Sequence, residues 1–371
     1  MAETLAHKDV VIPKKDITAT IDLLMKNLTT IKDDSGEFLL NFDGVIVDDK
    51  SWHVWNWPQG VGLYGIYKYW QMTKDPKALK VVTDWFENQF EIGAPPKNVN
   101  TMAPLLTMAF LYEDTKDQRY LPYLEDWAEW VMYDMPRTKE NGLEHITYGP
   151  ENVEQLWDDT LMMTVLPLAK IGKLLDRPEY LEEARYQFML HTKYLCDSKT
   201  GLWFHGWTFE ENHNYAEALW GRGNSWITIA IPEIIDILDL KKGDALREFL
   251  LATLTHQIEA LADCQSKNGL WHTLLNDPTS YEEASCTAAF AYGILKAVRK
   301  RYIDKKYEVN ATKAILGLLN EIDENGAVAK VSVGTGMGDN LQFYKDIRIT
   351  EMPYGQSLTV LALSEFLYHY I

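Results

Sequence analysis

Residues 223–238 read GNSWITIAIPEIIDIL, and this segment indicates how the chain folds. Apolar residues occupy nearly every side of the helix that it predicts, so such a helix has to be surrounded by other helices. Five more segments share this character: Gly60–Trp70, Ala103–Tyr112, Asp159–Leu174, Glu283–Val298 and Gly355–His369. Pro167 and Pro232 fall inside two of the six, where a straight helix would lose about 3 kcal/mol, so we expect a kink or a shifted boundary at each proline.

An amphipathic segment precedes each of these apolar segments. In Tyr180–Leu195, for example, the apolar side chains follow a single helical face. The six amphipathic segments are Asp16–Ile31, Pro76–Phe90, Gln118–Met132, Pro178–Leu195, Asp244–Asp263 and Asp304–Leu319. Six apolar helices ringed by six amphipathic ones form an α/α toroid, so the sequence predicts an all-α fold, an (α/α)6 barrel.

Turns that contain glycine recur along the chain at intervals of roughly 50–70 residues, which is typical of a repeat architecture. Their glycines are Gly36, Gly93, Gly142, Gly201, Gly269 and Gly326. Glycine suits such turns because they usually need a residue with positive φ. Six similar units indicate one closed repeat, and we therefore expect residues 1–371 to form a single domain.

Charge and hydropathy exclude several classes of partner. The chain has 36 Lys and Arg against 54 Asp and Glu, a net charge of −18, which argues against a nucleic-acid-binding surface. No apolar stretch is long enough to span a bilayer and no basic run suggests an anionic membrane, so we expect no membrane partner. The first ten residues lack the basic and apolar regions of a secretory signal, which favours a cytoplasmic location.

Motifs that bind metals or cofactors do not occur. Cys196, Cys264 and Cys286 have neither zinc nor redox spacing. The chain has no His-x-x-x-His pair, no Walker loop and no Gly-x-Ser-x-Gly elbow. The glycines of Gly60–Gly65 match dinucleotide-binding spacing, but they lie inside a helix-like segment and indicate close helix packing. We therefore expect no metal and no cofactor.

The loops that enter the apolar helices carry aromatic, acidic and basic residues. Since the starts of parallel inner helices meet at one end of a toroid, these residues would line one cavity. Asp158 and Asp159 either cap a helix or form a catalytic pair, in which a neighbouring charge and burial against Trp157 raise the pKa of one carboxyl. Arg222 lies between two glycines and either binds a substrate carboxylate or pairs with an acidic neighbour.

Several motifs occur in the order found in a known enzyme family. They are Trp57-Pro58-Gln59-Gly60-Val61, Leu111–Asp117, Trp157-Asp158-Asp159, Thr200–His205, Trp220–Trp226 and Val333-Gly334-Thr335. Over nearly the whole chain this set resembles glycoside hydrolase family 105, the unsaturated rhamnogalacturonyl hydrolases. The resemblance implies an (α/α)6 barrel that releases a Δ4,5-unsaturated uronic acid from the non-reducing end of a short oligosaccharide. It also implies that a carboxylic acid protonates C4, that water adds at C5, and that the resulting hemiketal opens.

The resemblance also implies roles for single residues. Asp159 matches the acid/base of the family, and Asp158 is its neighbour. The residues expected to contact the sugar are Trp57, Asn100, Trp157, Asp158, His205, Trp220, Arg222 and Trp226, with Lys330 and Arg348 as weaker candidates for a cation. Many relatives place Asp where Asn100 stands, so acid–base help from that position stays open. The best-known members carry His where Pro58 stands, so the identity of the leaving sugar stays open as well.

The residues alone leave three other interpretations open. An inverting glycosidase needs two carboxyl groups about 6.5–9.5 Å apart, for which Asp159 and Glu283 are the candidates. An epimerase would use paired histidines, for which His205 and His272 are available. A non-catalytic carbohydrate-binding protein would use Asp158 and Asp159 as helix caps and the tryptophans as core. The oligomeric state is not indicated.

Overall fold

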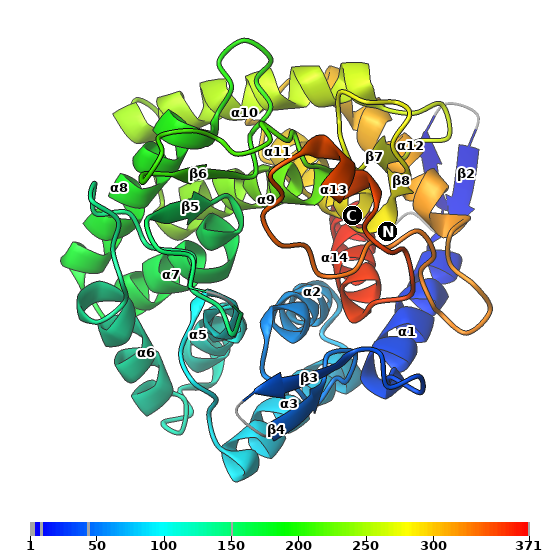
Figure 1. Cartoon of the computed structure of the whole chain (residues 1–371). Helices are drawn as coiled ribbons and strands as arrows, with labels where there is room; N and C mark the ends of the chain where they lie inside the picture. Colours follow the sequence, from blue (N-terminus) through cyan, green and yellow to red (C-terminus); the bar gives the residue numbers. More distant parts are fainter. Residues whose placement is uncertain (1–3, 8–9, 43–44, 150, 370–371) are drawn as a thin grey trace.

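The computed structural model describes residues 4–7, 10–42, 45–149 and 151–369. Within them, an inner ring of helices surrounds the axis of the molecule (Figure 1). The inner helices are α2 (Trp57–Thr73), α5 (Pro104–Thr115), α7 (Leu166–Leu174), α9 (Gly221–Ile237), α11 (Ala284–Arg299) and α14 (Pro353–His369). Each inner helix packs against the next, and α14 packs against α2, so the ring is closed.

An outer layer of helices covers this ring. Its members are α1 (Lys14–Thr30), α3 (Pro76–Ile92), α6 (Leu121–Tyr133), α8 (Pro178–Leu195), α10 (Ala245–Cys264) and α12 (Glu308–Leu319). Five of these outer helices pack against an inner helix that is their neighbour in sequence, whereas α1 packs against α14 from the other end of the chain. The prediction of an all-α (α/α)6 barrel is therefore confirmed, because the apolar segments form the inner ring and the amphipathic segments the outer layer.

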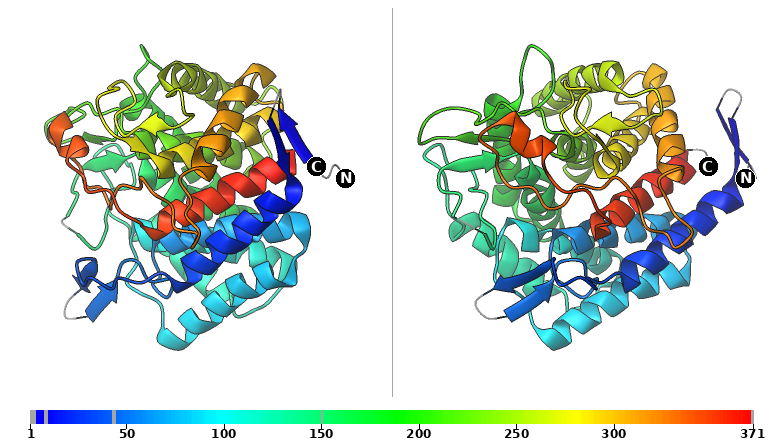
Figure 2. Two further views of the ribbon diagram at one scale, coloured as in Figure 1. Left: turned by 90° about the vertical axis from the view of Figure 1, so that its right-hand side faces the viewer. Right: turned by 45° about the vertical axis from the view of Figure 1, so that its right-hand side comes forward.

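Short elements occupy the connections between the long helices. The helical ones are α4 (Val99–Met102), a π-helical turn (Leu161–Val165), a 3-10 turn (Lys305–Tyr307) and α13 (Leu341–Lys345). The antiparallel strand pairs are β1 (Thr4–His7) with β2 (Val10–Pro13), β3 (Leu39–Phe42) with β4 (Val45–Asp48), β5 (Gln155–Trp157) with β6 (Gly206–Thr208), and β7 (Trp271–His272) with β8 (Glu282–Glu283). The β1–β2 hairpin projects from the outside of the barrel (Figure 2). No helix among the described residues combines the length and apolar character that crossing a bilayer requires.

The inner ring accommodates Pro167 and Pro232 in two different ways. Pro167 lies in the first turn of α7, directly after the π-helical turn, so the boundary is shifted and the missing N–H costs nothing there. Pro232 lies inside α9, where it leaves the carbonyl of Thr228 without its usual helical donor. Gly293 of α11 packs against that carbonyl, since a Cβ on Gly293 would lie 2.3 Å from Thr228 O.

The predicted turn glycines adopt the left-handed conformation in all but one case. Positive φ angles occur at Gly36, Gly93, Gly201, Gly269 and Gly326. At Gly142 the prediction is wrong, because the preceding Asn141 takes the left-handed conformation with φ of 61°. Gly142 is needed for space instead, since a Cβ there would lie 2.5 Å from Leu156 Cδ2.

Glycines on α2 allow the inner ring to close tightly. A Cβ on Gly60 would lie 2.8 Å from Ala103, and one on Gly62 would lie 2.7 Å from Ser357 Oγ on α14. The Gly60–Gly65 run therefore serves close helix packing, as expected from its sequence context, and does not form a nucleotide-binding turn.

Candidate active site

A cavity of about 660 Å³ opens at the end of the barrel where the inner helices begin. Of the residues expected at the site, those that line it are Trp57, Asn100, Trp157, Asp159, Trp220 and Arg222. The other three, Asp158, His205 and Trp226, are buried behind the cavity wall. The structure thus brings all nine residues into one region.

Two short strands position the acidic residues beside the histidine. Trp157 on β5 pairs with Gly206 on β6. Asp158 follows β5 and His205 precedes β6, so the two residues lie opposite each other, and the Asp158 N–H donates to the His205 carbonyl at 3.1 Å. A backbone ladder therefore fixes this pairing across a long stretch of sequence.

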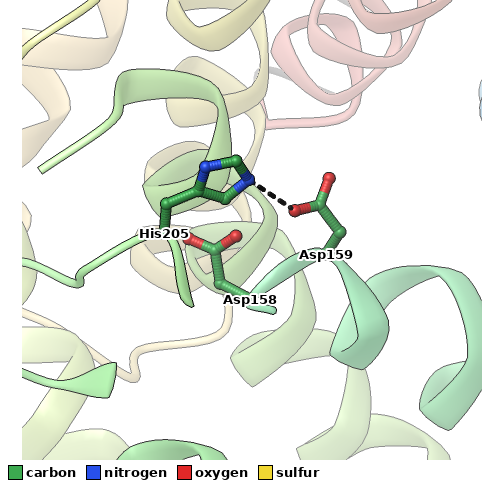
Figure 3. A group of neighbouring side chains, drawn as sticks. All are labelled: Asp158, Asp159 and His205. Carbon is green, nitrogen blue, oxygen red and sulfur yellow. Dashed lines mark ion pairs between the residues drawn. The ribbon is translucent and has the colours of Figure 1, made fainter. Parts of the chain in front are cut away.

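Asp159 is the acidic residue of this pair that lines the cavity. Figure 3 shows its carboxyl group beside the His205 ring. Its Oδ1 accepts a hydrogen bond from Trp226 Nε1 at 3.0 Å. Its Oδ2 lies 3.6 Å from His205 Nε2, and its side chain is 18% exposed. Asp158 is fully buried, so the two adjacent carboxyl groups meet different surroundings.

These surroundings separate the protonation states of the two carboxyl groups. Burial, together with the negative charge of Asp159, raises the pKa of Asp158 well above its ordinary value. Burial also acts to raise the pKa of Asp159, but the neighbouring His205 ring outweighs burial and holds that pKa below its ordinary value. Burial lowers the pKa of His205, although Asp159 opposes this effect. Asp158 is therefore neutral at neutral pH, and Asp159 is ionised.

Helix α9 leaves room for the Asp158 carboxyl because residue 223 is glycine. A Cβ on Gly223 would lie 2.3 Å from Asp158 Oδ2 and 2.8 Å from Asp158 Cγ. Any side chain at this position would displace Asp158, and Asp159 with it. The Gly-Arg-Gly sequence is thus required for close packing as well as for the placement of Arg222.

Arg222 is a nearly saturated hydrogen-bond donor. Nη1 donates to Ser332 Oγ at 2.7 Å and to the Ser332 carbonyl at 3.1 Å, and Nη2 donates to Thr335 Oγ1 at 2.9 Å and to the Val333 carbonyl at 3.0 Å. Nη1 also lies 3.6 Å from Glu283 Oε1. Arg222 therefore has an acidic neighbour, which was the alternative to binding a substrate carboxylate. Arg222 therefore anchors the loop of residues 332–335, one wall of the cavity.

The two weaker cation candidates lie outside the cavity lining. Lys330 pairs with Glu321 at 2.9 Å and with Glu282 at 3.2 Å. Arg348 pairs with Glu37. Neither side chain lines the cavity, and both have acidic partners where they are.

Aromatic faces form part of the cavity wall. Trp57 packs against Tyr354 with ring centroids 4.6 Å apart. Trp157 stacks on His145 at 4.2 Å with an interplanar angle of 5°. Flat apolar faces with polar edges suit the packing of sugar rings.

Several residues of the cavity lie outside the motifs that the sequence singles out. His145 lines it, and burial lowers its pKa to about 4, so its ring is neutral. Tyr215 also lines it and has a φ of 54°, which is uncommon for an aromatic residue. The loop Gly334–Asp339, of which only Gly334 and Thr335 lie in a quoted motif, continues the wall that residues 332–335 begin. Its three glycines were a signal of backbone close to a ligand, whereas neither His145 nor Tyr215 lies in a distinctive motif.

The residues that the alternative activities require are engaged elsewhere. Glu283 is buried at the start of α11, where it accepts hydrogen bonds from Cys286 N at 2.7 Å and Ser332 N at 3.0 Å. Both ring nitrogens of His272 have partners, Ser280 O at 2.6 Å and Ser266 Oγ at 3.1 Å. Neither Glu283 nor His272 lines the cavity, so the geometry favours neither a carboxyl pair nor a histidine pair.

Asp158, Asp159 and His205 are also the group of described residues that offers ligand atoms for a metal ion. These atoms lie within 4.8 Å of one another. Two carboxylates and an imidazole form a donor set that divalent cations accept, but only deprotonated carboxyl groups are ligands. A metal ion would therefore have to displace the proton that burial holds on Asp158.

A second cavity, of about 230 Å³, opens where the inner helices end. Lys296 in its wall pairs with Glu233 at 2.6 Å and Asp236 at 3.2 Å, and Lys300 pairs with Asp236 at 3.1 Å. Cations at the C-terminal ends of helices also interact favourably with the helix dipoles. This cavity has a structural explanation, and the larger cavity is the candidate active site.

The sequence was also compared with known proteins. The family model of Glycosyl Hydrolase Family 88 matches residues 30–370. The unsaturated rhamnogalacturonyl hydrolase YesR of Bacillus subtilis (strain 168) is 32% identical over 313 residues, which cover 83% of this chain and 89% of YesR.

Two solved structures are similar over almost the whole chain. Both proteins are described as a possible member of the GH105 family. The protein from Salmonella enterica is 55% identical with a TM-score of 0.97, and the match covers 99% of this chain and 97% of that one. The protein from Klebsiella pneumoniae is 54% identical with a TM-score of 0.96 and the same coverage of 99% and 97%.

Proposed function

Since the chain belongs to Glycosyl Hydrolase Family 88 and is a glycoside hydrolase, we propose that it hydrates the double bond of a Δ4,5-unsaturated uronic acid at the non-reducing end of a short oligosaccharide. The resemblance to glycoside hydrolase family 105 is confirmed, and the chain is of the unsaturated rhamnogalacturonyl or glucuronyl hydrolase type. We further propose that the oligosaccharide derives from rhamnogalacturonan, as the name of the Bacillus relative suggests. A polysaccharide lyase has to act first, because β-elimination creates the double bond.

The observation that carries this proposal is the single cavity-facing carboxyl group of the Asp158–Asp159 pair. Asp159 lies in the cavity, held by Trp226 and close to His205, with a neutral carboxyl behind it. Protonation of an enol ether needs one well-placed acid and one oriented water, and neither a covalent nucleophile nor a second carboxyl across the bond. We therefore assign proton delivery to C4 to Asp159.

An anionic substrate supplies the condition that Asp159 needs in order to act as an acid. The cavity lining already includes Glu151, Asp159 and Asp339, and the donors of its arginine are directed to the 332–335 loop. Another carboxylate in this space raises the pKa of Asp159, because like charges favour the protonated form. The proposed substrate therefore promotes protonation of its own catalyst.

The remaining steps follow from the two states of Asp159. Protonation of C4 forms a C–H bond and leaves a cation at C5 that the ring oxygen stabilises. The Asp159 carboxylate then accepts a proton from water while the water oxygen bonds to C5. The resulting hemiketal opens at the ring C5–O bond, and the product hemiacetal at C1 releases the leaving sugar as an alcohol.

Uncharged donors are proposed to hold the uronic acid. Trp220 Nε1 is buried and has no hydrogen-bond partner among the described residues, although Trp220 lines the cavity. An indole N–H is a donor only, so a substrate oxygen would satisfy it. Trp57 and Trp157 provide faces for the sugar rings, and Arg222 contributes by holding the 332–335 loop.

A panel of unsaturated disaccharides tests the proposed function. We expect loss of alkene absorbance with a rhamnose leaving group, and no cleavage of the corresponding saturated disaccharide. In D2O, the product isolated at early times should carry one deuterium at C4. Cleavage of the saturated substrate, or turnover without loss of the alkene, would refute the hydration mechanism.

A further inference from the structure

Tyr344 reaches the candidate active site from a part of the chain that the sequence analysis left without a role. It belongs to α13, in the segment between Val333 and α14 that crosses the mouth of the barrel (Figure 1). Its side chain is fully buried, between His205 and Trp220 on one side and the glycine-rich loop on the other. The Tyr344 ring packs closely against Gly338, where a Cβ would lie only 2.9 Å from Tyr344 Cε2.

The Tyr344 hydroxyl is held at His205. Its oxygen lies 2.8 Å from His205 Nδ1 and accepts a hydrogen bond from Gly338 N–H at 3.2 Å. The other acceptor near the hydroxyl hydrogen is Met337 Sδ, at 3.7 Å. An imidazole nitrogen at the shorter distance is the better acceptor, because thioether sulfur accepts only weakly.

The position of Asp159 also places the imidazole hydrogen of His205 on Nε2. His205 Nε2 faces Asp159 Oδ2 at 3.6 Å, and an ionised carboxylate can only accept a hydrogen bond. A neutral imidazole carries one hydrogen, so a hydrogen on Nε2 leaves Nδ1 as an acceptor, which Tyr344 O–H satisfies. The reverse tautomer would place the Nε2 lone pair against the carboxylate.

We propose that Tyr344 is a positioning residue for catalysis, which donates its hydroxyl hydrogen to His205 Nδ1 and so keeps the imidazole hydrogen on Nε2, directed at Asp159. The effect of Tyr344 on catalysis rests on the proposed function, whereas the tautomer of His205 is inferred from the distances alone. The Nε2–H stabilises the Asp159 carboxylate that forms when the proton passes to C4. Tyr344 itself touches neither the reacting atoms nor, in its buried position, the solvent.

Other charged groups around His205 and Tyr344 set the background of this effect. The hydrogen-bonded and ion-paired groups are Tyr344, His205 and Asp159. Each of them is acted on electrostatically by one or more of four other residues, Asp158, His145, Arg222 and Asp339. A Tyr344→Phe substitution leaves all four in place and removes the hydroxyl, together with its hydrogen bonds to His205 and Gly338. Changes in pH dependence can therefore be assigned to the lost hydroxyl.

The test is the pH dependence of kcat for Tyr344→Phe with the unsaturated disaccharide. We expect kcat to fall about tenfold, as for the loss of one hydrogen bond, with KM changed less than twofold. Without the fixed Nε2–H donor, the Asp159 carboxylate loses stabilisation and its pKa rises. The alkaline limb of the kcat profile, where Asp159 loses its proton, should therefore move to higher pH.

Tyr302→Phe is the matched control. Tyr302 donates to Asp236 Oδ1 at 2.6 Å near the C-terminal ends of the inner helices, so this variant also loses one tyrosine hydrogen bond. We expect its kcat and pH profile to match those of the wild type. A fall in kcat for Tyr344→Phe with an unmoved alkaline limb would show a merely structural role and would overturn the proposal.

A spectroscopic readout separates this proposal from the proposed function. With 15N-labelled histidine, the wild-type protein should show His205 Nδ1 as the unprotonated nitrogen and Nε2 as the protonated one, and Tyr344→Phe should show a mixture of tautomers. Protonated Nδ1 in the wild type would refute the tautomer assignment even if the enzyme is active. An inactive wild type with the expected tautomer would instead count against the proposed function alone.

Discussion

Asp158 and Asp159 are adjacent in the chain, yet their carboxyl groups have opposite electrostatic surroundings. Asp158 points against Gly223 and is fully buried, which favours its neutral form. Asp159 points to the cavity, where Trp226 and His205 favour its charged form. One residue of the pair therefore holds a proton while its neighbour meets the substrate. A pair of this kind can separate the storage of a proton from its delivery.

Exchanging each carboxyl for an amide distinguishes the two roles. We expect Asp159→Asn to lower kcat by about 10²–10⁴-fold, because an amide cannot deliver the proton. Asp158→Asn should lose less than about tenfold, since it replaces a neutral group of the same shape. Steady-state loss of alkene absorbance measures both. A larger loss in Asp158→Asn than in Asp159→Asn would mean that Asp158 supplies the proton.

A buried histidine away from the cavity makes stability depend on pH. His191 on α8 is fully buried, and burial lowers its pKa to about 4 from 6.5. The unfolded chain then binds more protons than the folded one between these values, so the free energy of unfolding falls as the pH falls from about 6.5 to 4. The contribution is at most about 3 kcal/mol.

Denaturant titrations across this range check the linkage. We expect the decrease in unfolding free energy between pH 6.5 and pH 4 to be smaller in His191→Gln than in the wild type, whatever the stability of the variant at pH 7. His213→Gln is the control, because its side chain is 44% exposed. A His191→Gln slope equal to that of the wild type would show that His191 does not titrate with folding.

At the scale of elements, the contact between α9 and α11 shows how the inner ring tolerates a proline. Pro232 frees the Thr228 carbonyl, and Gly293 allows α11 to approach that carbonyl closely. The start of α9 borders the site through Arg222, and Glu283, just before α11, lies behind the 332–335 loop. The spacing of these two helices therefore positions the loop that Arg222 and Glu283 jointly hold.

Gly293→Ala tests this close contact. Its Cβ would lie 2.3 Å from a backbone oxygen, so the helices have to move apart, and we expect the free energy of unfolding to fall by about 1–3 kcal/mol. Gly149→Ala is a control at an exposed glycine whose Cβ would lie 3.4 Å from its nearest neighbour. Chemical denaturation measures both variants. A Gly293→Ala protein as stable as the control would show that the ring adjusts without cost.

For the whole molecule, the decisive feature is closure of the ring between α14 and α2. The first and last inner helices pack together, so neither half of the barrel completes its core alone. We therefore propose that residues 1–371 fold as one unit. Far-ultraviolet circular dichroism, which reports helices around the whole ring, and fluorescence of the tryptophans, which lie within residues 52–271, should give coincident unfolding transitions. Two separate transitions would indicate independent subdomains.

The reaction proposed for the whole enzyme depends on protons and not on a Lewis acid. A metal ion at Asp158, Asp159 and His205 would compete with the proton on Asp158. We expect extensive treatment with a chelator to leave kcat and the melting temperature unchanged. Loss of activity that an added divalent cation restores would contradict this expectation.

The sequence by itself determined the barrel. Hydrophobic periodicity is local, and helices that are apolar on nearly every side, such as 223–238, have few arrangements other than an inner ring. The ordered motifs also carried the family resemblance, and the short motif Trp157-Asp158-Asp159 marked the acidic pair. Each apolar segment and each motif is short and local, and only the order of the motifs, from Trp57 to Thr335, spans the chain.

Only the tertiary structure decided which carboxyl meets the cavity, what Arg222 binds and where Tyr344 lies. Burial, charge and hydrogen bonding at Asp159 come from His205 on another loop, and Arg222 and Tyr344 meet partners more than one hundred residues away. A pKa or a hydrogen bond depends on distances in space, which sequence spacing does not encode once loops of different length intervene. Closure of the ring sets those distances.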